Sequence, residues 1–281
     1  MIKISFQGEH GAYSEQAIKN HCKSLNIIDF LTVPCLSFFD AIEEVVKGGV
    51  DFVMLPVENS LAGSVIPAYD ELIKSNLKVR SEIVLKVEHC LMGMIGCDMS
   101  NIEGVISHPQ ALSQCSDSLK RMKLSPQVFS DTAGAAKYIS ERKKYKLLAI
   151  ASKLAAETYG LNVIQSSFED EPFNFTRFFL MGYSNVGAKT EDTNSKTKTS
   201  IIFSVEDKAN ALVRILNIFG NYNINLTKIE SRPSRDRAWN YLFFIDFEGS
   251  EDDTNVQKAL LEILKNSTFL KVLGSYKTNS Y

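Results

Sequence analysis

The sequence predicts an α/β protein in two parts, and three features of the chain predict it. Over residues 1–183, short apolar strands alternate with amphipathic helices, a pattern typical of parallel sheets covered by helices. Residues 184–198 are rich in Thr, Asn and Lys and lack hydrophobic periodicity, which indicates a linker. Residues 199–281 then follow the order β-α-β-β-α-β, which predicts a ferredoxin-like unit.

The composition is that of an ordinary globular protein. The 281 residues are 44% apolar and 23% charged with a net charge of −2, so neither a nucleic acid nor a membrane surface is an expected partner. No apolar run approaches the length of a membrane span, and the N-terminus predicts a strand rather than a signal peptide. Five scattered cysteines without a Cys-x-x-Cys and four histidines without ligand spacing predict a cytoplasmic protein with no metal.

Polar loops follow the first strands of the chain. The alternating strand at residues 2–6 leads through glycines into a helix, a turn that either brings the backbone close to an anion or simply makes a tight connection. A strand over 51–57 ends in a loop with Asn59, Ser60 and Ser64 and then feeds a helix. Because ligands of parallel sheets bind beyond the carboxyl ends of the strands, these three side chains are candidate substrate contacts, with plain turn chemistry as the alternative.

The middle of the chain repeats this alternation after a long alternating stretch at 78–94, which predicts a strand or a pair of strands that crosses between two lobes. His108 precedes a helix and is either a general base or a structural residue. Thr132 and Ala133 open an alanine-rich helix whose free N–H groups could face an anion, although an ordinary helix cap predicts the same sequence. Two such lobes that face each other make a cleft, a usual place for a small ligand.

Residues 174–179 set three polar side chains, Asn174, Thr176 and Arg177, among aromatic ones. Neighbouring side chains of a strand point to opposite faces, and polar groups in an aromatic strand are costly without partners. The stretch is therefore either an edge strand with its polar residues in water, or a cleft wall. In the second case Arg177 holds an anion and Thr176 offers a proton or a hydrogen bond.

The second part has its own strands and helices. The pattern predicts strands over 199–205, 225–231, 239–247 and 270–276, with helices over 209–222 and 252–266. A polar turn at 234–237 separates the second and third of these strands.

Six segments together resemble the prephenate dehydratase family along the full length of the chain. They are residues 8–15, 56–60, 108–112, 131–136, 174–178 and, for the phenylalanine-binding motif of an ACT regulatory domain, 230–233. The resemblance implies a two-lobed catalytic domain like periplasmic binding proteins, a C-terminal ACT domain, and a homodimer or homotetramer. Since Met1 leads straight into the first predicted strand, no chorismate mutase segment is expected upstream.

The resemblance also implies a reaction, in which prephenate loses carbon dioxide and water to give phenylpyruvate without any cofactor. Thr176 would then donate to the departing hydroxyl, Arg177 would bind a carboxylate, and Phe178 would keep the cleft dry. The implied substrate contacts are Asn59, Ser60, Ser64, Thr132, Ala133 and Asn174.

L-Phenylalanine is the implied feedback effector. The implied effector contacts are Asn210, Ala211, Leu212, Glu230, Ser231, Arg232 and Pro233. Ala209 and Asn210 replace the proline and glycine of the family pattern, and asparagine tolerates a positive φ but adds a side chain. Two alternatives stay open: an arogenate dehydratase, and a catalytically silent amino-acid-binding regulator.

Overall fold

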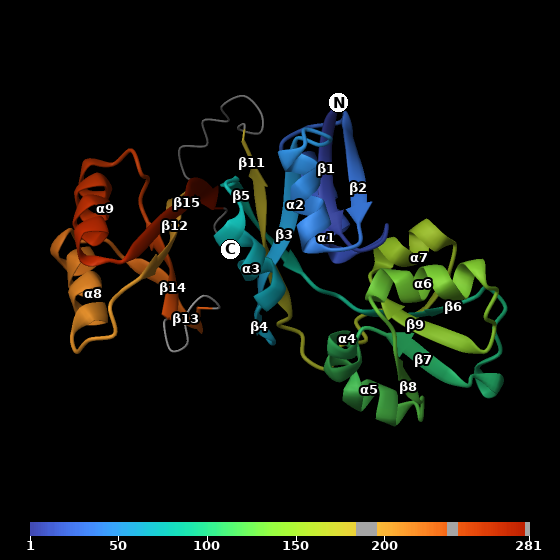
Figure 1. The fold of residues 1–281 in the computed structure, drawn as a ribbon. Helices are drawn as coiled ribbons and strands as arrows, with labels where there is room; N and C mark the ends of the chain where they lie inside the picture. Colours follow the sequence, from blue (N-terminus) through green and yellow to red (C-terminus); the bar gives the residue numbers. More distant parts are fainter. Residues whose placement is uncertain (184–195, 235–240, 279–281) are drawn as a thin grey trace. The chain divides into compact units, whose positions relative to one another are not determined.

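The computed structural model describes residues 1–183, 196–234 and 241–278, which form two compact units (Figure 1). The first unit comprises Met1–Glu71 and Ile83–Phe179, and the second comprises Leu72–Glu82 and Leu180–Tyr281. Residues 184–195 of the predicted linker and residues 235–240 of the predicted turn and strand lie outside the described residues. Residues 196–198, predicted as the end of the linker, instead begin a strand, because Lys196 pairs with Thr278 in a sheet ladder.

The first unit has two lobes, and the first lobe is built on a sheet with the order β11-β3-β1-β2. β1 runs parallel to both β2 and β3, and their inward residues Ile4, Phe6 and Met54 are fully buried. Ser37 caps α2, since its hydroxyl accepts a hydrogen bond from the Asp40 amide at 3.0 Å. The elements of this lobe are β1 (Ile2–Gln7), α1 (Tyr13–Ser24), β2 (Phe30–Cys35), α2 (Phe38–Val46), β3 (Phe52–Asn59) and β4 (Gly63–Ser64). Three further elements have residues in both units: α3 (Ile66–Lys74), β5 (Lys78–Lys86) and β11 (Phe175–Gly182).

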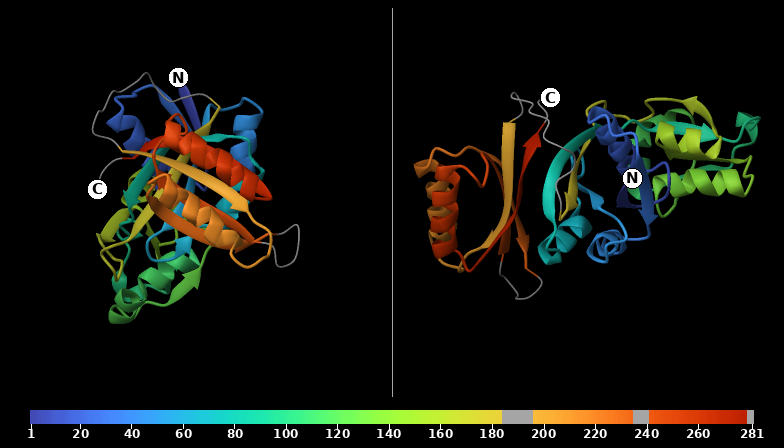
Figure 2. Two further views of the ribbon diagram at one scale, coloured as in Figure 1. Left: turned by 90° about the vertical axis from the view of Figure 1, so that its left-hand side faces the viewer. Right: turned by 90° about the horizontal axis from the view of Figure 1, so that it is seen from above.

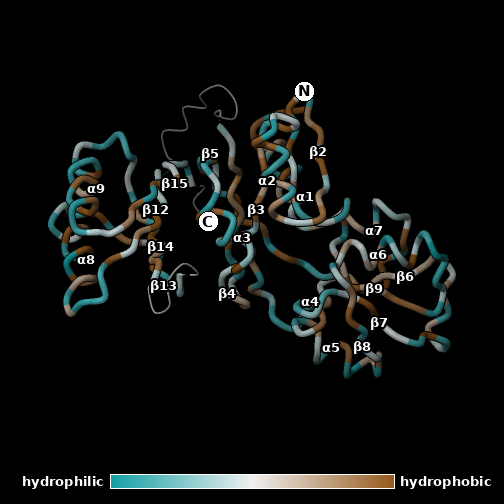
Figure 3. The backbone as a smooth tube through the Cα atoms, viewed as in Figure 1, coloured by the Kyte–Doolittle hydropathy of each residue, from teal (hydrophilic) through white to brown (hydrophobic). Residues whose placement is uncertain are grey.

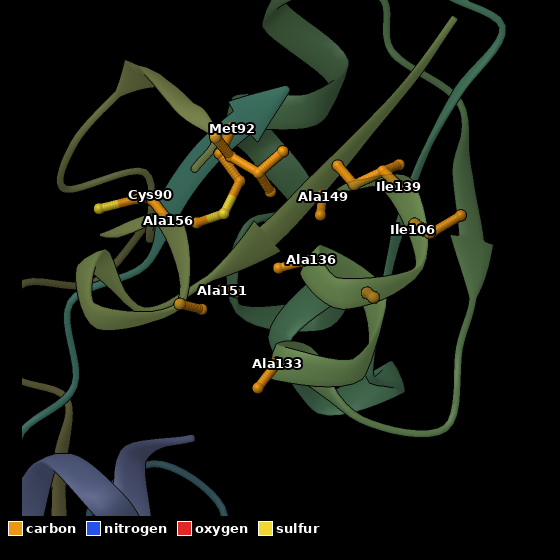
Figure 4. Packing of buried hydrophobic residues seen from close by; sticks show 12 residues of the cluster. Cys90, Met92, Ile106, Ala133, Ala136, Ile139, Ala149, Ala151 and Ala156 are labelled. Atoms are coloured by element: carbon orange, nitrogen blue, oxygen red, sulfur yellow. The ribbon is translucent and has the colours of Figure 1, made fainter. Parts of the chain in front are cut away.

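The second lobe has a separate sheet with the order β10-β6-β9-β7-β8. Small residues of α6, among them Ala133 and Ala136, let this helix lie close against the sheet, where Met92 and Ala149 complete the core (Figure 4). Its elements are β6 (Cys90–Gly93), the 3₁₀ turn Met99–Asn101, β7 (Gly104–Ser107), α4 (Pro109–Gln114), α5 (Ser116–Arg121), β8 (Pro126–Val128), α6 (Thr132–Glu141), β9 (Leu147–Ala151), α7 (Lys153–Tyr159) and β10 (Asn162–Gln165). The stretch predicted at 78–94 is the pair β5 and β6, which lie in different sheets, so the predicted crossing is confirmed.

The second unit carries an antiparallel sheet with the order β13-β14-β12-β15 and, at its edge, the first residues of β5. α8 and α9 lie side by side on one face of this sheet, as Figure 2 shows, and Phe219 of α8 packs there with Phe203 and Phe247 of the sheet in a buried core. Hydrophobic residues run along β9 in the sheet of the second lobe and along β12 in the sheet of the second unit (Figure 3). The elements are β12 (Lys196–Ser204), α8 (Ala211–Asn221), β13 (Leu226–Pro233), β14 (Tyr241–Glu248), α9 (Thr254–Asn266) and β15 (Phe269–Thr278).

The predicted fold class is confirmed: a two-lobed α/β domain precedes a βαββαβ domain. Across the three described stretches, every helix is too short or too polar to cross a lipid bilayer.

Candidate active site

The candidate active site is a cleft of about 530 Å³ in the first unit, lined by residues of both lobes. The first lobe contributes the loops that follow β1 and β3 and the first residues of α1 and α3. These loops lie at the carboxyl ends of parallel strands, where a ligand was expected. The second lobe contributes His108, Gln110, Ala111, Gln114, Asp131 and Thr132.

Thr176 lies in the wall of this cleft, on β11, with 9% of its surface exposed. Its Oγ1 accepts a hydrogen bond of 3.0 Å from the side-chain amide of Asn59. No acceptor for the Thr176 hydroxyl hydrogen exists among the described residues. The hydroxyl is therefore polarised by an incoming hydrogen bond and can donate its own hydrogen to a molecule in the cleft.

Asn59 is oriented by two backbone amides. Its Oδ1 accepts from the N–H groups of Leu61 at 3.1 Å and Ala62 at 2.9 Å, so its Nδ2 must be the end that faces Thr176. The same Nδ2 lies 2.7 Å from Oδ1 of Asn174, to which it donates. The geometry of the loop after β3 thus fixes which atoms of Asn59 donate and which accept.

The hydrogen bonds continue from Asn174 to the opposite lobe. Nδ2 of Asn174 donates to Oε1 of Gln114 at 3.0 Å, and Nε2 of His89 lies 2.9 Å from the same oxygen. Since that oxygen can only accept, His89 carries its hydrogen on Nε2. Its Nδ1 can then accept from the Tyr13 hydroxyl at 2.8 Å, and the same hydroxyl lies 3.0 Å from the Glu88 carbonyl oxygen, a second acceptor for its hydrogen.

In this hydrogen-bond network, the side-chain nitrogen of Gln114 has no acceptor among the described residues. Its Oε1 is occupied twice, while its Nε2 is buried and has no hydrogen-bond partner among the described residues. A buried amide nitrogen without a partner is costly unless a ligand supplies the acceptor. Gln114 is therefore a candidate contact for an anionic or carbonyl oxygen in the cleft.

The pKa values of Tyr13 and His89, the two titrating groups of this hydrogen-bond network, are shifted so that the neutral forms are favoured. Burial lowers the pKa of His89 and outweighs the hydrogen bond to Gln114 and the charge of Glu169, which both raise it. Burial also raises the pKa of Tyr13 well above its usual value. A neutral imidazole and a neutral phenol are the forms that the Tyr13 to His89 hydrogen bond requires.

A tight contact joins the loop after β1 to the second lobe. Gly11 has a φ of +87°, and a Cβ there would lie 2.6 Å from the Cα of Ala155. The hydroxyl of Ser152 donates to the Gly11 carbonyl at 2.5 Å, and that of Tyr159 donates to the His10 carbonyl at 2.8 Å. The turn predicted from its glycines thus holds the two lobes together beside the cleft.

Several residues predicted from the sequence lie in the cleft lining. Thr176 and Phe178 alternate with Arg177 on β11 and share the face toward the cleft, and Phe178 is 1% exposed. Ser64 and Thr132 also line the cleft, as does His108, whose Nδ1 accepts from the Gln110 amide at 3.3 Å. His108 therefore caps α4, and the structure places it where either of the two predicted roles is possible.

The structure does not place Arg177 in the cleft. Strand alternation turns its side chain to the opposite face of β11 from Thr176, where its guanidinium lies 3.3 Å from Glu58 and 5.0 Å from the ring centre of Phe179. Arg177 is absent from the described cleft lining. The expected grip of Arg177 on a substrate carboxylate therefore stays a prediction, and the contacts with Glu58 and Phe179 give the residue a structural role.

Three further predicted substrate contacts have structural partners instead. The Ser60 hydroxyl donates to the Phe173 carbonyl at 2.8 Å and accepts from the Phe175 amide at 2.9 Å, which ties β3 to β11. Asn174 is fully buried between Asn59 and Gln114. Ala133 is fully buried in the core beneath α6. None of the three is among the described lining residues, so substrate contact by Ser60, by Asn174 and by the helix-start amide near Ala133 stays a prediction.

Sequence reasoning missed Gln114, Tyr13 and His89. Tyr13 lies within residues 8–15, a segment that resembles the family, but the sequence alone predicts no role for its side chain. Gln110 and Gln114 are four residues apart on α4 and both line the cleft, so helical periodicity could have found the second. For His89, the sequence contains no local signal, because its partners come from residues 13 and 114.

The predicted effector residues lie on α8 and the edge strand β13 of the second unit. Asn210 precedes α8 with a φ of +68°, so asparagine does occupy a left-handed position here. On β13, Ser231 pairs with Phe243 on the helix-covered face, while Glu230 pairs with Phe244 on the other face. A cavity of about 810 Å³ in this unit is lined by Gly220 and residues 222–225, 248–249 and 253–256, and none of the predicted effector residues is among the described lining residues.

Comparison with known proteins identifies the family. Residues 4–186 match the family described as prephenate dehydratase, and residues 199–265 match the ACT domain. The chain belongs to the prephenate dehydratase family. Members of this family are carbon–oxygen lyases of phenylalanine biosynthesis, so the predicted enzyme class is confirmed.

The names of individual relatives differ in the activity that they state. "Arogenate dehydratase/prephenate dehydratase 2, chloroplastic" of Arabidopsis thaliana is 39% identical, over 99% of this chain and 74% of its own. The structure of prephenate dehydratase from Arthrobacter aurescens in complex with L-Phe is 30% identical with a TM-score of 0.86, over 99% of this chain and 90% of its own. The structure of GqqA, described as a novel type of quorum quenching acylase, is 31% identical with a TM-score of 0.84, over 99% and 98%.

Arg177→Met is expected to lower stability rather than substrate affinity. The substitution removes the ion pair with Glu58 and the cation–π contact with Phe179, which should cost about 1–2 kcal/mol of the free energy of unfolding. Urea unfolding and the KM for substrate check this, with Arg142→Met on the exposed end of α6 as the matched control. A large rise in KM without loss of stability would indicate that Arg177 binds the substrate.

The unfolding free energy is expected to fall as the pH drops below about 6.5. His89 has an ordinary pKa of 6.5 and a lowered pKa in the folded state, so below 6.5 the unfolded chain binds a proton that the folded chain does not. His89→Gln keeps a donor for Gln114 and does not titrate, so it should lose less stability on acidification. Urea unfolding between about pH 7.5 and 5 compares the two proteins. Buried His21, whose pKa is lowered to about 4, is present in both, and identical slopes would contradict the prediction.

Proposed function

We propose that this chain is a prephenate dehydratase, which converts prephenate to phenylpyruvate with loss of carbon dioxide and water. The observation that carries the proposal is the Thr176 hydroxyl, which lies in the cleft and accepts from Asn59. Its own hydrogen has no acceptor among the described residues, so it can be given to a substrate oxygen.

The reaction needs little more than this donor. The bond between the ring and its carboxylate breaks, and the electron pair moves into the ring as the bond to the ring hydroxyl breaks. The departing hydroxide takes up a proton and leaves as water, while the ring becomes aromatic. Thr176 supplies a hydrogen bond, or the proton itself, to the oxygen on which negative charge develops. Phe178 and the other apolar lining residues keep the cleft poor in water, which strengthens this hydrogen bond.

The two carboxylates of prephenate are held by neutral donors in this proposal. Among the described residues that line the cleft there is no lysine or arginine. Instead, the amino-terminal ends of α1, α3 and α6 border the cleft, and the free backbone N–H groups of such ends favour negative charge. The Nε2 of Gln114 adds a side-chain donor.

Arogenate is a second candidate substrate, and one residue favours it. Asp131 lines the cleft at the start of α6, where its Oδ1 accepts from the Gly134 amide at 2.6 Å. Its carboxylate would oppose a second negative group nearby but attract the ammonium group that distinguishes arogenate from prephenate. The name of the Arabidopsis relative, which includes both activities, supports the same pair of candidates.

A side-by-side turnover assay tests the proposal. The purified full chain is given prephenate or arogenate, and phenylpyruvate and phenylalanine are followed by chromatography. We expect phenylpyruvate from prephenate at a rate at least equal to that of phenylalanine from arogenate. Faster turnover of arogenate would show that arogenate, and not prephenate, is the substrate. Because one similar structure is described as an acylase, an N-acyl amide is assayed as well, and its hydrolysis without dehydration of either compound would overturn the proposal.

We further assign catalysis to residues 1–183 and regulation by L-phenylalanine to residues 199–281, in a homodimer or homotetramer. The complex of the Arthrobacter relative with L-Phe supports this effector. The left-handed backbone of Asn210 supports L-phenylalanine binding as well, and so do residues 230–233, which keep the phenylalanine-binding motif that they resemble. Calorimetry with L-phenylalanine, and the turnover rate at increasing L-phenylalanine, test the assignment, and an absence of both binding and inhibition would refute it.

A further inference from the structure

One segment of the chain starts and ends in the cleft but has its middle in the other unit. Ile66 and Pro67, at the start of α3, line the cleft, and so do Val87 and His89, which follow β5. Between them, Leu72–Glu82 belongs to the second unit. Whatever holds this middle portion therefore acts on two walls of the cleft through the covalent chain.

Lys271 of β15 holds the carboxyl end of α3. Its ammonium group donates to the carbonyl oxygens of Leu72 at 3.0 Å and Ile73 at 2.8 Å, and to that of Ser75. The last carbonyls of a helix have no partner within the helix, and a positive charge there is favourable. Three acceptors match the three hydrogens of the ammonium group, so Lys271 acts as the cap of this helix.

Two further contacts fasten the same segment to β15. The ammonium group of Lys78 donates to the Val272 carbonyl at 2.7 Å. Gly274 lets the two backbones approach, since a Cβ there would lie 2.7 Å from the carbonyl oxygen of Val79. Burial, and then the charge of Lys78, lower the pKa of Lys271. The segment thus moves with β15, and Lys271 is its contact with the helix.

We propose that Lys271 is a positioning residue for the cleft, because it fixes the carboxyl end of α3 to β15 while the other end of α3 forms the cleft wall. A nine-residue helix is about 13 Å long and stiff along its axis, so a displacement of β15 reaches Ile66 and Pro67. This makes α3 the route by which an effector bound in the second unit changes the cleft. The inference rests on the proposed function for its kinetic readout only.

The test compares three variants of the full chain. Lys271→Met removes the ammonium group and keeps the stem, Lys271→Arg keeps the charge, and Lys258→Met removes an exposed charge from α9 as the control. We expect Lys271→Met to raise the KM for substrate about 2- to 30-fold with kcat nearly unchanged. Lys271→Arg should recover most of the affinity, and Lys258→Met should match the unchanged chain.

A second readout does not depend on turnover. Hydrogen exchange of the Ala68 and Tyr69 amides, which bond to the Val65 carbonyl at the cleft end of α3, should be faster in Lys271→Met. A local loss of the cap alone would change exchange only near Ser75. Unchanged KM together with unchanged exchange at Ala68 and Tyr69 would overturn the inference. If the unchanged chain turns over neither substrate, the proposed function fails, while the exchange comparison still decides the role of Lys271.

The effector gives the third readout. L-Phenylalanine should raise the half-saturating substrate concentration of the unchanged chain, and Lys271→Met should lose most of that shift while calorimetry still detects bound L-phenylalanine. A full shift in Lys271→Met would show that the effect travels by another route and would overturn the proposed one.

Discussion

Thr176→Ala is expected to lower kcat by about 10²–10³ while the protein remains folded. The substitution removes the donor to the oxygen that leaves, and it also removes the acceptor that Asn59 uses at 3.0 Å. Because Thr176 contacts the part of the substrate where charge develops, the loss should fall on kcat more than on KM. Steady-state kinetics with prephenate, alongside thermal unfolding, measure the effect.

Two further variants separate chemistry from structure at this position. Thr176→Ser keeps the hydroxyl and should recover most of the activity. Thr158→Ala removes an exposed threonine of α7 and should leave kcat unchanged. Near-normal turnover of Thr176→Ala, with its fold intact, would remove Thr176 from the mechanism.

Gln114→Met should cost about as much catalytic efficiency, on the order of 10² in kcat/KM. Methionine preserves the volume of the side chain but removes the buried Nε2 donor, which has no partner among the described residues, and the Oε1 that accepts from His89 and Asn174. Two buried donors are then left without a partner, so the free energy of unfolding should also fall, by about 1–3 kcal/mol. Kinetics and urea unfolding measure the two effects separately.

Gln165→Met, on the exposed edge strand β10, is the matched control and should change neither quantity. Gln114→Glu tests the donor alone, since its carboxylate still accepts but cannot donate to an anionic substrate. Full activity in Gln114→Glu would show that the substrate does not use this donor.

The sequence predicted part of the candidate site because that part is local. Thr176 and Phe178 could be found in one aromatic strand, and the same alternation that puts them in the cleft turns Arg177 away to Glu58. The network around Gln114 could not be predicted in this way. His89, Gln114 and Asn174 come from three separate elements, and their pairing depends on how the lobes fold together.

The helices and strands could be predicted from the sequence more fully than the pairing of the strands. Strand and helix periodicity predicted both domains, since each element buries one face against its own sheet. Periodicity says nothing about which sheet edge a strand joins. The assignment of Leu72–Glu82 to the second unit depends on contacts with β15, more than 190 residues along the chain, such as the one between Lys78 and Val272.

The hydrogen bonds from Asn59 to Tyr13 have a polarity, set at one end by the amides of Leu61 and Ala62. Each amide side chain along the line must therefore present its oxygen on one side and its nitrogen on the other. At Asn59 and Asn174, which both donate within the network, an exchange of amide for acid cannot be compensated by rotating a neighbouring amide, because the orientation of that neighbour is fixed in the same way. Deamidation of Asn59 would thus leave the oxygens of Asn174 and Thr176 without their donor, and deamidation of Asn174 would remove a donor to Gln114.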